Sequence, residues 1–180
     1  CFVFDDVLKN FQDLMAIRED INVVHAFGYT SVPAKYCDIL RGGFGRSLKI
    51  KYYDAEQFVE QIKFSAVWGN CYRRLFIMKN KLFFREHVVF EDTDWSLKAV
   101  YLAKTIGCLD YPYYGYREND VSTTRRDGDI KVMMNNAQGA FAVYEYFSQL
   151  RDLSSTMRSL VTCRIKDCVV GYFFRIGVSL

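Results

Sequence analysis

The sequence predicts an α/β layered domain, a mixed sheet flanked by helices, that ends in a pair of helices. Two observations support this fold class. Short apolar stretches alternate with stretches of helical periodicity up to about residue 120, and from Asp129 onward the spacing of apolar residues is helical throughout. We therefore assign residues 1–126 to the α/β part and residues 127–180 to a C-terminal helical segment.

The first third of the chain predicts strands and helices in alternation. Residues 1–6 form an apolar stretch that ends in Asp5 and Asp6, and a helix is expected directly after it. Residues 21–29 and 48–53 predict two strands, and we interpret His25 in the first of them as a core histidine. Residues 54–57, Asp-Ala-Glu-Gln, have the pattern of a capping box that opens a helix.

The remainder predicts three helices and one more strand. A helix is expected after Asp92, with Trp95, Ala99, Leu102 and Ile106 on one side. Residues 108–117 carry alternating aromatics and predict a strand. Two apolar stripes then predict a helical pair buried in the core or in a helix interface. The first stripe consists of Ile130, Met133, Met134, Ala137, Phe141, Tyr144 and Phe147; the second of Met157, Leu160, Val161, Cys168 and Tyr172, with Ser154 or Ser155 as its cap.

Composition excludes several classes of protein. Hydrophobic residues make up 51% of the 180, enough for one sizeable core, and there are only two prolines. The net charge of +3 is small and the basic residues are scattered, so we predict no nucleic-acid partner. Six cysteines without a CxxC pair, beside two histidines, indicate free thiols in a cytoplasmic protein. No apolar stretch is long enough to span a membrane, which leaves peripheral contact with the inner face of one as an option.

Two adjacent carboxylates, Glu91 and Asp92, follow the apolar run Val88–Phe90 and precede the predicted helix. In one interpretation Asp92 or Thr93 caps the helix and the helix dipole favours the negative charges. In the other, one carboxylate faces a cleft as a general base, and repulsion from its neighbour together with partial burial raises its pKa. The two interpretations are compatible.

An ordered set of segments resembles the family 2 glycosyltransferases. The resemblance covers roughly residues 54–126. It is carried by Ala66-Val67-Trp68-Gly69-Asn70-Cys71-Tyr72-Arg73-Arg74, Leu82-Phe83-Phe84, Val89-Phe90-Glu91-Asp92-Thr93, Tyr101-Leu102-Ala103-Lys104 and Tyr113-Tyr114-Gly115-Tyr116-Arg117.

The resemblance implies the later half of a GT-A type fold and transfer of a sugar, with inversion, from a nucleoside diphosphate sugar to an acceptor hydroxyl. Asp92 would be the base and Glu91 its supporting neighbour. Asp6, with Asp5, would hold Mg²⁺ or Mn²⁺ against the diphosphate, although these acids could equally cap the following helix. Trp68 would shape the acceptor side or belong to the core. Arg117 would meet the diphosphate or begin a solvated loop, and Arg73 and Arg74 would bind phosphate or be solvated.

The implied acceptor is a carbohydrate or a lipid-linked sugar, with a role in surface or capsular polysaccharide synthesis. The donor-binding half that precedes the Asp5–Asp6 strand in the resembling enzymes is not in this sequence. We therefore expect the chain alone to be inactive, and to self-associate or to cover an unpaired sheet edge with its C-terminal helices. The alternative is a non-catalytic module in which Trp68 and the aromatic strand line a carbohydrate or protein groove.

Overall fold

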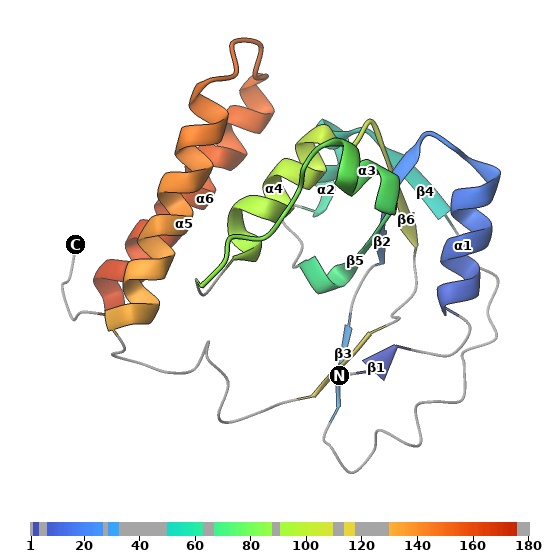
Figure 1. The fold of residues 1–180 in the computed structure, drawn as a ribbon, viewed down its shortest axis with the longest axis horizontal. Helices are drawn as coiled ribbons and strands as arrows, with labels where there is room; N and C mark the ends of the chain where they lie inside the picture. The colour runs from blue at the N-terminus through green and yellow to red at the C-terminus, as the bar shows by residue number, and fades with distance from the viewer. Residues whose placement is uncertain are drawn as a thin grey trace.

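The structure is a computed structural model that describes residues 2–3, 7–26, 29–32, 50–62, 67–87, 91–109, 114–117 and 130–175 (Figure 1). Its first elements are β1 (Phe2–Val3), α1 (Val7–Ile17), β2 (Ile21–Ala26), β3 (Tyr29–Val32), β4 (Ile50–Tyr53), α2 (Ala55–Ile62) and the 3-10 helix η3 (Val67–Gly69). There follow β5 (Asn70–Tyr72), α3 (Arg74–Lys79), α4 (Asp92–Leu102), β6 (Thr105–Leu109), β7 (Tyr114–Arg117), α5 (Ile130–Ser148) and α6 (Ser155–Arg175).

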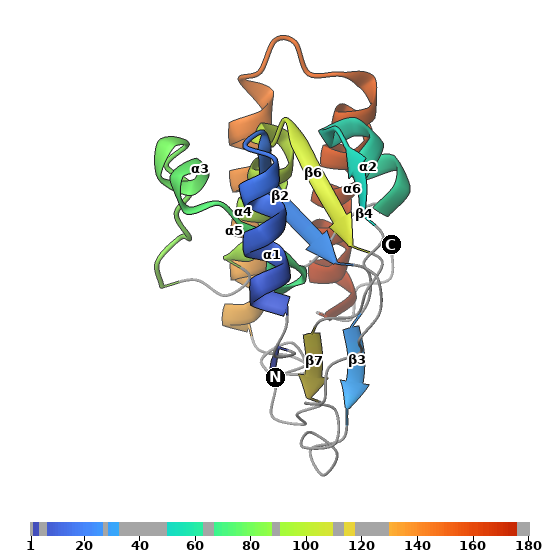
Figure 2. The same cartoon turned by 90° about the vertical axis from the view of Figure 1, so that its right-hand side faces the viewer.

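The main sheet is mixed and has four strands in the order β4-β6-β2-β5. The two central strands, β2 and β6, are parallel, with Val24 opposite Gly107, while β4 and β5 pair antiparallel at the edges. A smaller sheet of order β1-β7-β3 lies at one end of the molecule (Figure 2). The predicted class, α/β with a mixed sheet and flanking helices, is confirmed.

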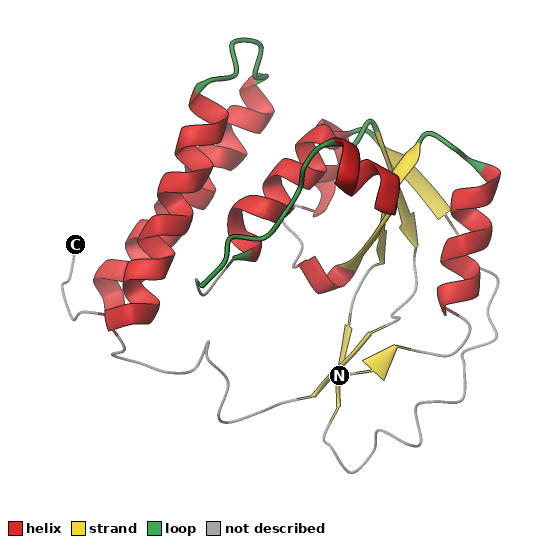
Figure 3. Cartoon of the chain, in the orientation of Figure 1, coloured by secondary structure: helices red, strands yellow, loops and turns green. Residues whose placement is uncertain are grey.

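Helices cover the main sheet in layers (Figures 1 and 3). α1 lies on the opposite side of the sheet from α5 and α6, and α4 and α2 lie between the sheet and that helical pair. One hydrophobic cluster runs through these layers, from Val23 and Ile106 in the sheet through Trp95 in α4 to Val143 and Met157 in the helical pair. The C-terminal helices therefore pack on other helices, on α4 and α2, and share their core.

Two helix starts have the caps that the sequence predicts. The backbone N–H of Gln57 donates to Asp54 Oδ1 at 2.8 Å and the N–H of Asp54 donates to Gln57 Oε1 at 3.2 Å, which is a complete capping box. At α6 the N–H of Met157 donates to Ser154 Oγ at 3.2 Å. The predicted caps of α2 and α6 are confirmed.

Two strand predictions are wrong in their extent. Residues 21–29 do not form one strand, because β2 ends at Ala26 and Tyr29 begins β3 in the smaller sheet. Similarly, β6 already begins at Thr105, and the predicted strand 108–117 divides between β6 and β7, which belong to different sheets. Ile106 lies in β6, where Val23 and Tyr53 are its register partners, and not on the helix that contains Trp95.

The apolar stripe predicted for α5 is mostly on the solvent side. Met134, Phe141 and Tyr144 are exposed, at 55%, 66% and 58%, whereas Val143 and Phe147 are buried. α5 packs through its other face, where Gly139 and its neighbours meet α4 and α6. Glycine has no side chain, so Thr93 of α4 and the side chain of Arg85 lie beside the backbone of α5 at this position. In α6, by contrast, the predicted residues Met157, Val161 and Cys168 are buried.

Candidate active site

Asp92 is the first residue of α4, and Glu91 occupies the N-cap position before it. Glu91 has helical backbone angles, φ −60° and ψ −21°, and no side chain caps the helix through a hydrogen bond. The prediction that Asp92 or Thr93 is the capping residue is therefore wrong. The prediction that Asp92 lies at the N-terminal end of a helix is confirmed, and its carboxylate is not used as a cap.

The environment of Asp92 raises the pKa of its carboxyl group. Partial burial is the main cause, and the negative charges of Glu91 and Asp94 act in the same direction. The backbone hydrogen bond and the positive charge of Arg164, on α6, oppose the shift. A carboxylate with a raised pKa binds a proton more readily than an ordinary aspartate, as a general base must.

Asp94, two residues further on, has a structural role. Its side chain is buried, and its two oxygens accept hydrogen bonds from Arg85 Nε at 2.9 Å and Lys98 Nζ at 2.8 Å. Both contacts are ion pairs that neutralise the carboxylate. Lys98 follows Asp94 by four residues, a spacing that can indicate an ion pair on a helix. No local pattern indicates that Arg85 pairs with Asp94. Asp92 and Glu91, by contrast, form no ion pair with another described residue.

α5 runs alongside α4 in the same direction and closes this site on one side. Gly139 lies opposite Thr93, Tyr146 lies under the ammonium group of Lys98 at 5.0 Å, and Phe147 contacts Tyr101. Asn135 comes one helical turn before Gly139, on the side of the start of α4. Its side chain is buried, and within the described ranges its Nδ2 has no hydrogen-bond partner. No local pattern in the sequence indicates a role for Asn135.

A series of hydrogen-bonded polar side chains connects β2 with β5. His25 Nδ1 and Asn70 Oδ1 are 2.9 Å apart, and Asn70 Nδ2 donates to the hydroxyl of Tyr72 at 3.0 Å. Burial lowers the pKa of His25, so it is a neutral core histidine, as expected. Burial, together with the charge of Asp92, raises the pKa of Tyr72, whose ring meets Trp95 edge to face. No local pattern indicates this chain of polar residues, because His25 lies 45 residues before its partner Asn70.

The structure does not place all the other predicted site residues near the start of α4. Trp68 is half-buried in η3, immediately ahead of β5. Arg117 is the last residue of β7, in the smaller sheet. Asp5 and Asp6 lie outside the described residues. Among the residues that are described, no three or more His, Cys, Asp or Glu side chains gather as a metal site, so the metal remains a prediction that depends on Asp5 and Asp6.

Arg73 has a structural role. Its guanidinium donates to the backbone carbonyls of Ile21 at 3.0 Å, Met15 at 2.8 Å and Arg18 at 3.3 Å. It therefore links the turn between α1 and β2 to the end of β5 and is not simply solvated, while phosphate binding by Arg73 stays a prediction. Arg74 is exposed.

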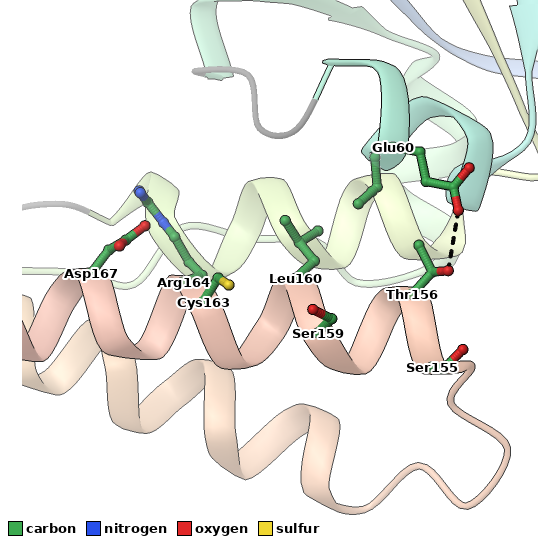
Figure 4. Close-up of a pocket in the computed structure, with 9 residues that line it drawn as sticks. Glu60, Ser155, Thr156, Ser159, Leu160, Cys163, Arg164 and Asp167 are labelled. Carbon is green, nitrogen blue, oxygen red and sulfur yellow. Dashed lines mark hydrogen bonds between the residues drawn. The ribbon is translucent and has the colours of Figure 1, made fainter.

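A groove of about 630 Å³ lies between α2 and α6 (Figure 4). α2 contributes Val59 and Glu60, and Thr156 Oγ1 donates to Glu60 Oε1 at 3.3 Å at one end. Arg164 and Asp167 lie toward the other end. Because Arg164 lines the groove and also acts electrostatically on Asp92, that end of the groove is the one nearer the start of α4. The remaining lining residues, all on α6, are Ser155, Ser159, Leu160 and Cys163.

Comparison with known proteins gives no family for this chain. No model of a known protein family matches it, and no curated protein has a significantly similar sequence. The described helices include none that is long and apolar enough to cross a membrane.

Proposed function

We propose that the protein is a glycosyltransferase of the GT-A type and that Asp92 is the general base of an inverting sugar transfer. One observation carries the proposal: Asp92 is half-buried at the start of α4, uncapped, with its pKa raised by burial and by the charge of Glu91. The resemblance of residues 54–126 to family 2 glycosyltransferases supports it, as does the four-stranded mixed sheet.

In the proposed reaction the carboxylate of Asp92 takes the proton of an acceptor hydroxyl. The acceptor oxygen forms a bond to C1 of the donor sugar, while the bond between C1 and the diphosphate oxygen breaks. The nucleoside diphosphate leaves with the electron pair, and the configuration at C1 inverts. The negative charge of Glu91 helps to keep the pKa of Asp92 high. The two ion pairs of Asp94, with Arg85 and with Lys98, hold the first turn of α4 in place.

Charge also develops on the leaving diphosphate, and a divalent cation is a common means of stabilising it. Asp5 and Asp6 are the candidate ligands for Mg²⁺ or Mn²⁺, and Arg117 is a candidate contact for the diphosphate. Trp68 is a candidate for the acceptor side, since it lies in η3, which directly precedes β5, and the charge of Asp92 contributes to the raised pKa of Tyr72 in β5.

The test is Asp92→Asn in the full-length protein. The amide keeps the shape of the side chain and loses the base, so we expect turnover to fall about 10²- to 10⁴-fold. Release of nucleoside diphosphate from uridine and guanosine diphosphate sugars, with Mn²⁺ and acceptor, measures turnover, and calorimetry measures donor binding, which should be unchanged.

Asp13→Asn on the exposed side of α1 makes the same chemical change away from the site and serves as the control. Near-normal turnover of Asp92→Asn would refute the role of Asp92. Binding of saccharide without any transfer, in the unmodified protein, would favour the non-catalytic carbohydrate-binding module instead.

A further inference from the structure

We propose that the groove between α2 and α6 binds a neutral carbohydrate, and that this carbohydrate is the acceptor substrate. Its role as acceptor depends on the function proposed above, whereas binding itself does not. The inference starts from three properties of the groove: its place relative to Asp92, its mixture of apolar and oxygen-bearing side chains, and its charge.

The groove is formed by two helices that the common core holds in place. α2 and α6 pack against each other, and Phe58, next to the lining residue Val59, is fully buried. Its volume of about 630 Å³ is in the range of small-molecule sites, about 300–1,000 Å³. With Arg164 at the end nearer Asp92, a ligand lying along α6 would have one end close to the proposed base.

The lining suits a sugar ring, which has an apolar face of C–H groups and a rim of hydroxyls. Val59 and Leu160 supply apolar surface. Glu60 and Asp167 can accept hydrogen bonds from hydroxyls, Arg164 can donate them, and hydroxyl side chains such as Ser159 can do both. Oxygen groups spaced along a partly apolar surface favour a ligand that is polar around its edge and apolar on its face.

The charges favour a neutral sugar over an acidic or phosphorylated one. Two carboxylates, Glu60 and Asp167, and one guanidinium, Arg164, line the groove. Asp92 and Glu91 add negative charge near the Arg164 end. An anionic ligand would meet more like than opposite charge here, and like-charge contacts oppose binding.

Cys163 allows a direct test, because it lines the groove and is an exposed free thiol. The rate at which N-ethylmaleimide modifies Cys163 in the full chain is measured by peptide mass spectrometry. The probes are methyl glucoside, methyl galactoside, methyl N-acetylglucosaminide and lactose at 50 mM, and glucuronate at the same concentration. A sugar with a Kd of about 10 mM should slow modification about sixfold, and glucuronate should have a much smaller effect.

Two tryptophan variants locate the binding. Ser159→Trp fills the groove, and Thr162→Trp places the same bulk at another exposed position of α6, outside the groove. Saturation-transfer NMR of the best neutral sugar should lose its signal with Ser159→Trp and keep it with Thr162→Trp. Should Ser159→Trp fail to fold, the alkylation experiment on the unmodified chain still decides.

The inference is overturned if none of the four neutral sugars protects Cys163, if glucuronate protects it equally well, or if both variants keep the signal. These measurements use no donor, so they are separate from the Asp92 test. Sugar binding in the groove with normal turnover of Asp92→Asn would remove Asp92 as the base and keep the groove as a sugar site. Loss of turnover in Asp92→Asn without sugar protection would keep the base and move the acceptor elsewhere.

Discussion

Three acidic residues close together at the start of α4, Glu91, Asp92 and Asp94, have different surroundings. Asp94 is buried between two cations and is neutralised by them. Burial and the negative charge of Glu91 raise the pKa of Asp92. A pair of titratable groups whose environments differ in this way is what acid–base chemistry requires.

The raised pKa of Asp92 should cost stability at neutral pH. In the unfolded chain this carboxyl ionises near pH 4, whereas in the folded protein ionisation needs a higher pH, so above the folded pKa the ionised form opposes folding. Asp92→Asn should therefore raise Tm at pH 7, and the gain should disappear toward pH 3, where Asp92 is protonated in both states. Thermal unfolding followed by circular dichroism at several pH values measures this.

Asp20 gives the matched control of opposite sign. The hydrogen bond from Arg18, followed by the one from Thr105, lowers the pKa of its carboxyl group. Asp20→Asn should therefore not raise Tm at pH 7, and any effect should be a small loss, since the residue is exposed. A lower Tm for Asp92→Asn than for the unmodified protein at pH 7 would contradict the raised pKa.

Removing the charge of Asp94 should destabilise the protein at neutral pH. Asp94→Asn removes the negative charge that pairs with Arg85 and Lys98, and breaking a fully buried pair costs about 3–5 kcal/mol. Here the two cations keep about a quarter of their side-chain surface exposed, 25% and 23%, so water compensates in part. We expect a loss of about 2 kcal/mol in the free energy of unfolding, measured with urea. A loss no larger than that of Asp13→Asn would show that the pairs do not stabilise the fold.

At the scale of elements, Gly139 lies where α5 faces α4. A Cβ at Gly139 would lie 3.4 Å from Arg85 Nη2 and 3.7 Å from Thr93 Cβ, which are ordinary van der Waals distances, so a methyl group fits and a larger side chain must displace these neighbours. Phe141 and Tyr144 lie on the exposed side of α5.

Gly139→Leu should therefore destabilise the fold by about 1–3 kcal/mol through overpacking. Ala137→Leu, two residues earlier on the exposed side of α5, adds nearly the same side chain without a neighbour to displace and should be close to neutral. Urea unfolding of both variants measures the difference. Equal stability of the two would mean that α5 does not pack on α4 through Gly139.

At the scale of the molecule, the helical pair and the sheet share one hydrophobic core. Met157 in α6 and Val23 in β2 are members of the same buried cluster, connected through Trp95 and its neighbours in α4. The described cysteines, Cys71, Cys108, Cys163 and Cys168, are free thiols, so packing and not disulfide bonds joins these residues of the two parts.

The chain should consequently unfold in one cooperative transition. Met157→Ala, in the helical pair, should cost about 2–5 kcal/mol and lower the urea midpoint equally whether tryptophan fluorescence or helical circular dichroism is followed. Thr162→Ala on the exposed side of the same helix is the control. Two separate transitions would show that residues 127–180 form an independent unit.

The sequence by itself determined what depends on neighbours three or four residues away. The capping box at Asp54, the Ser154 cap, the start of a helix at Asp92 and the alternation of strands and helices are local, because their hydrogen bonds and periodicities lie within a few residues. The α/β class followed from that alternation. Glu91 and Asp92 could be selected because they stand together in the chain.

Only the tertiary structure decided what depends on residues far apart. Which face of α5 is buried follows from its packing against α4 and α6, and the structural role of Arg73 follows from carbonyls more than 50 residues earlier. Asp94 is paired with Arg85, and the pKa of Asp92 is raised mainly by burial, which the packing around α4 sets. Local patterns carry no record of such partners, since burial and charge pairing are set by the whole fold.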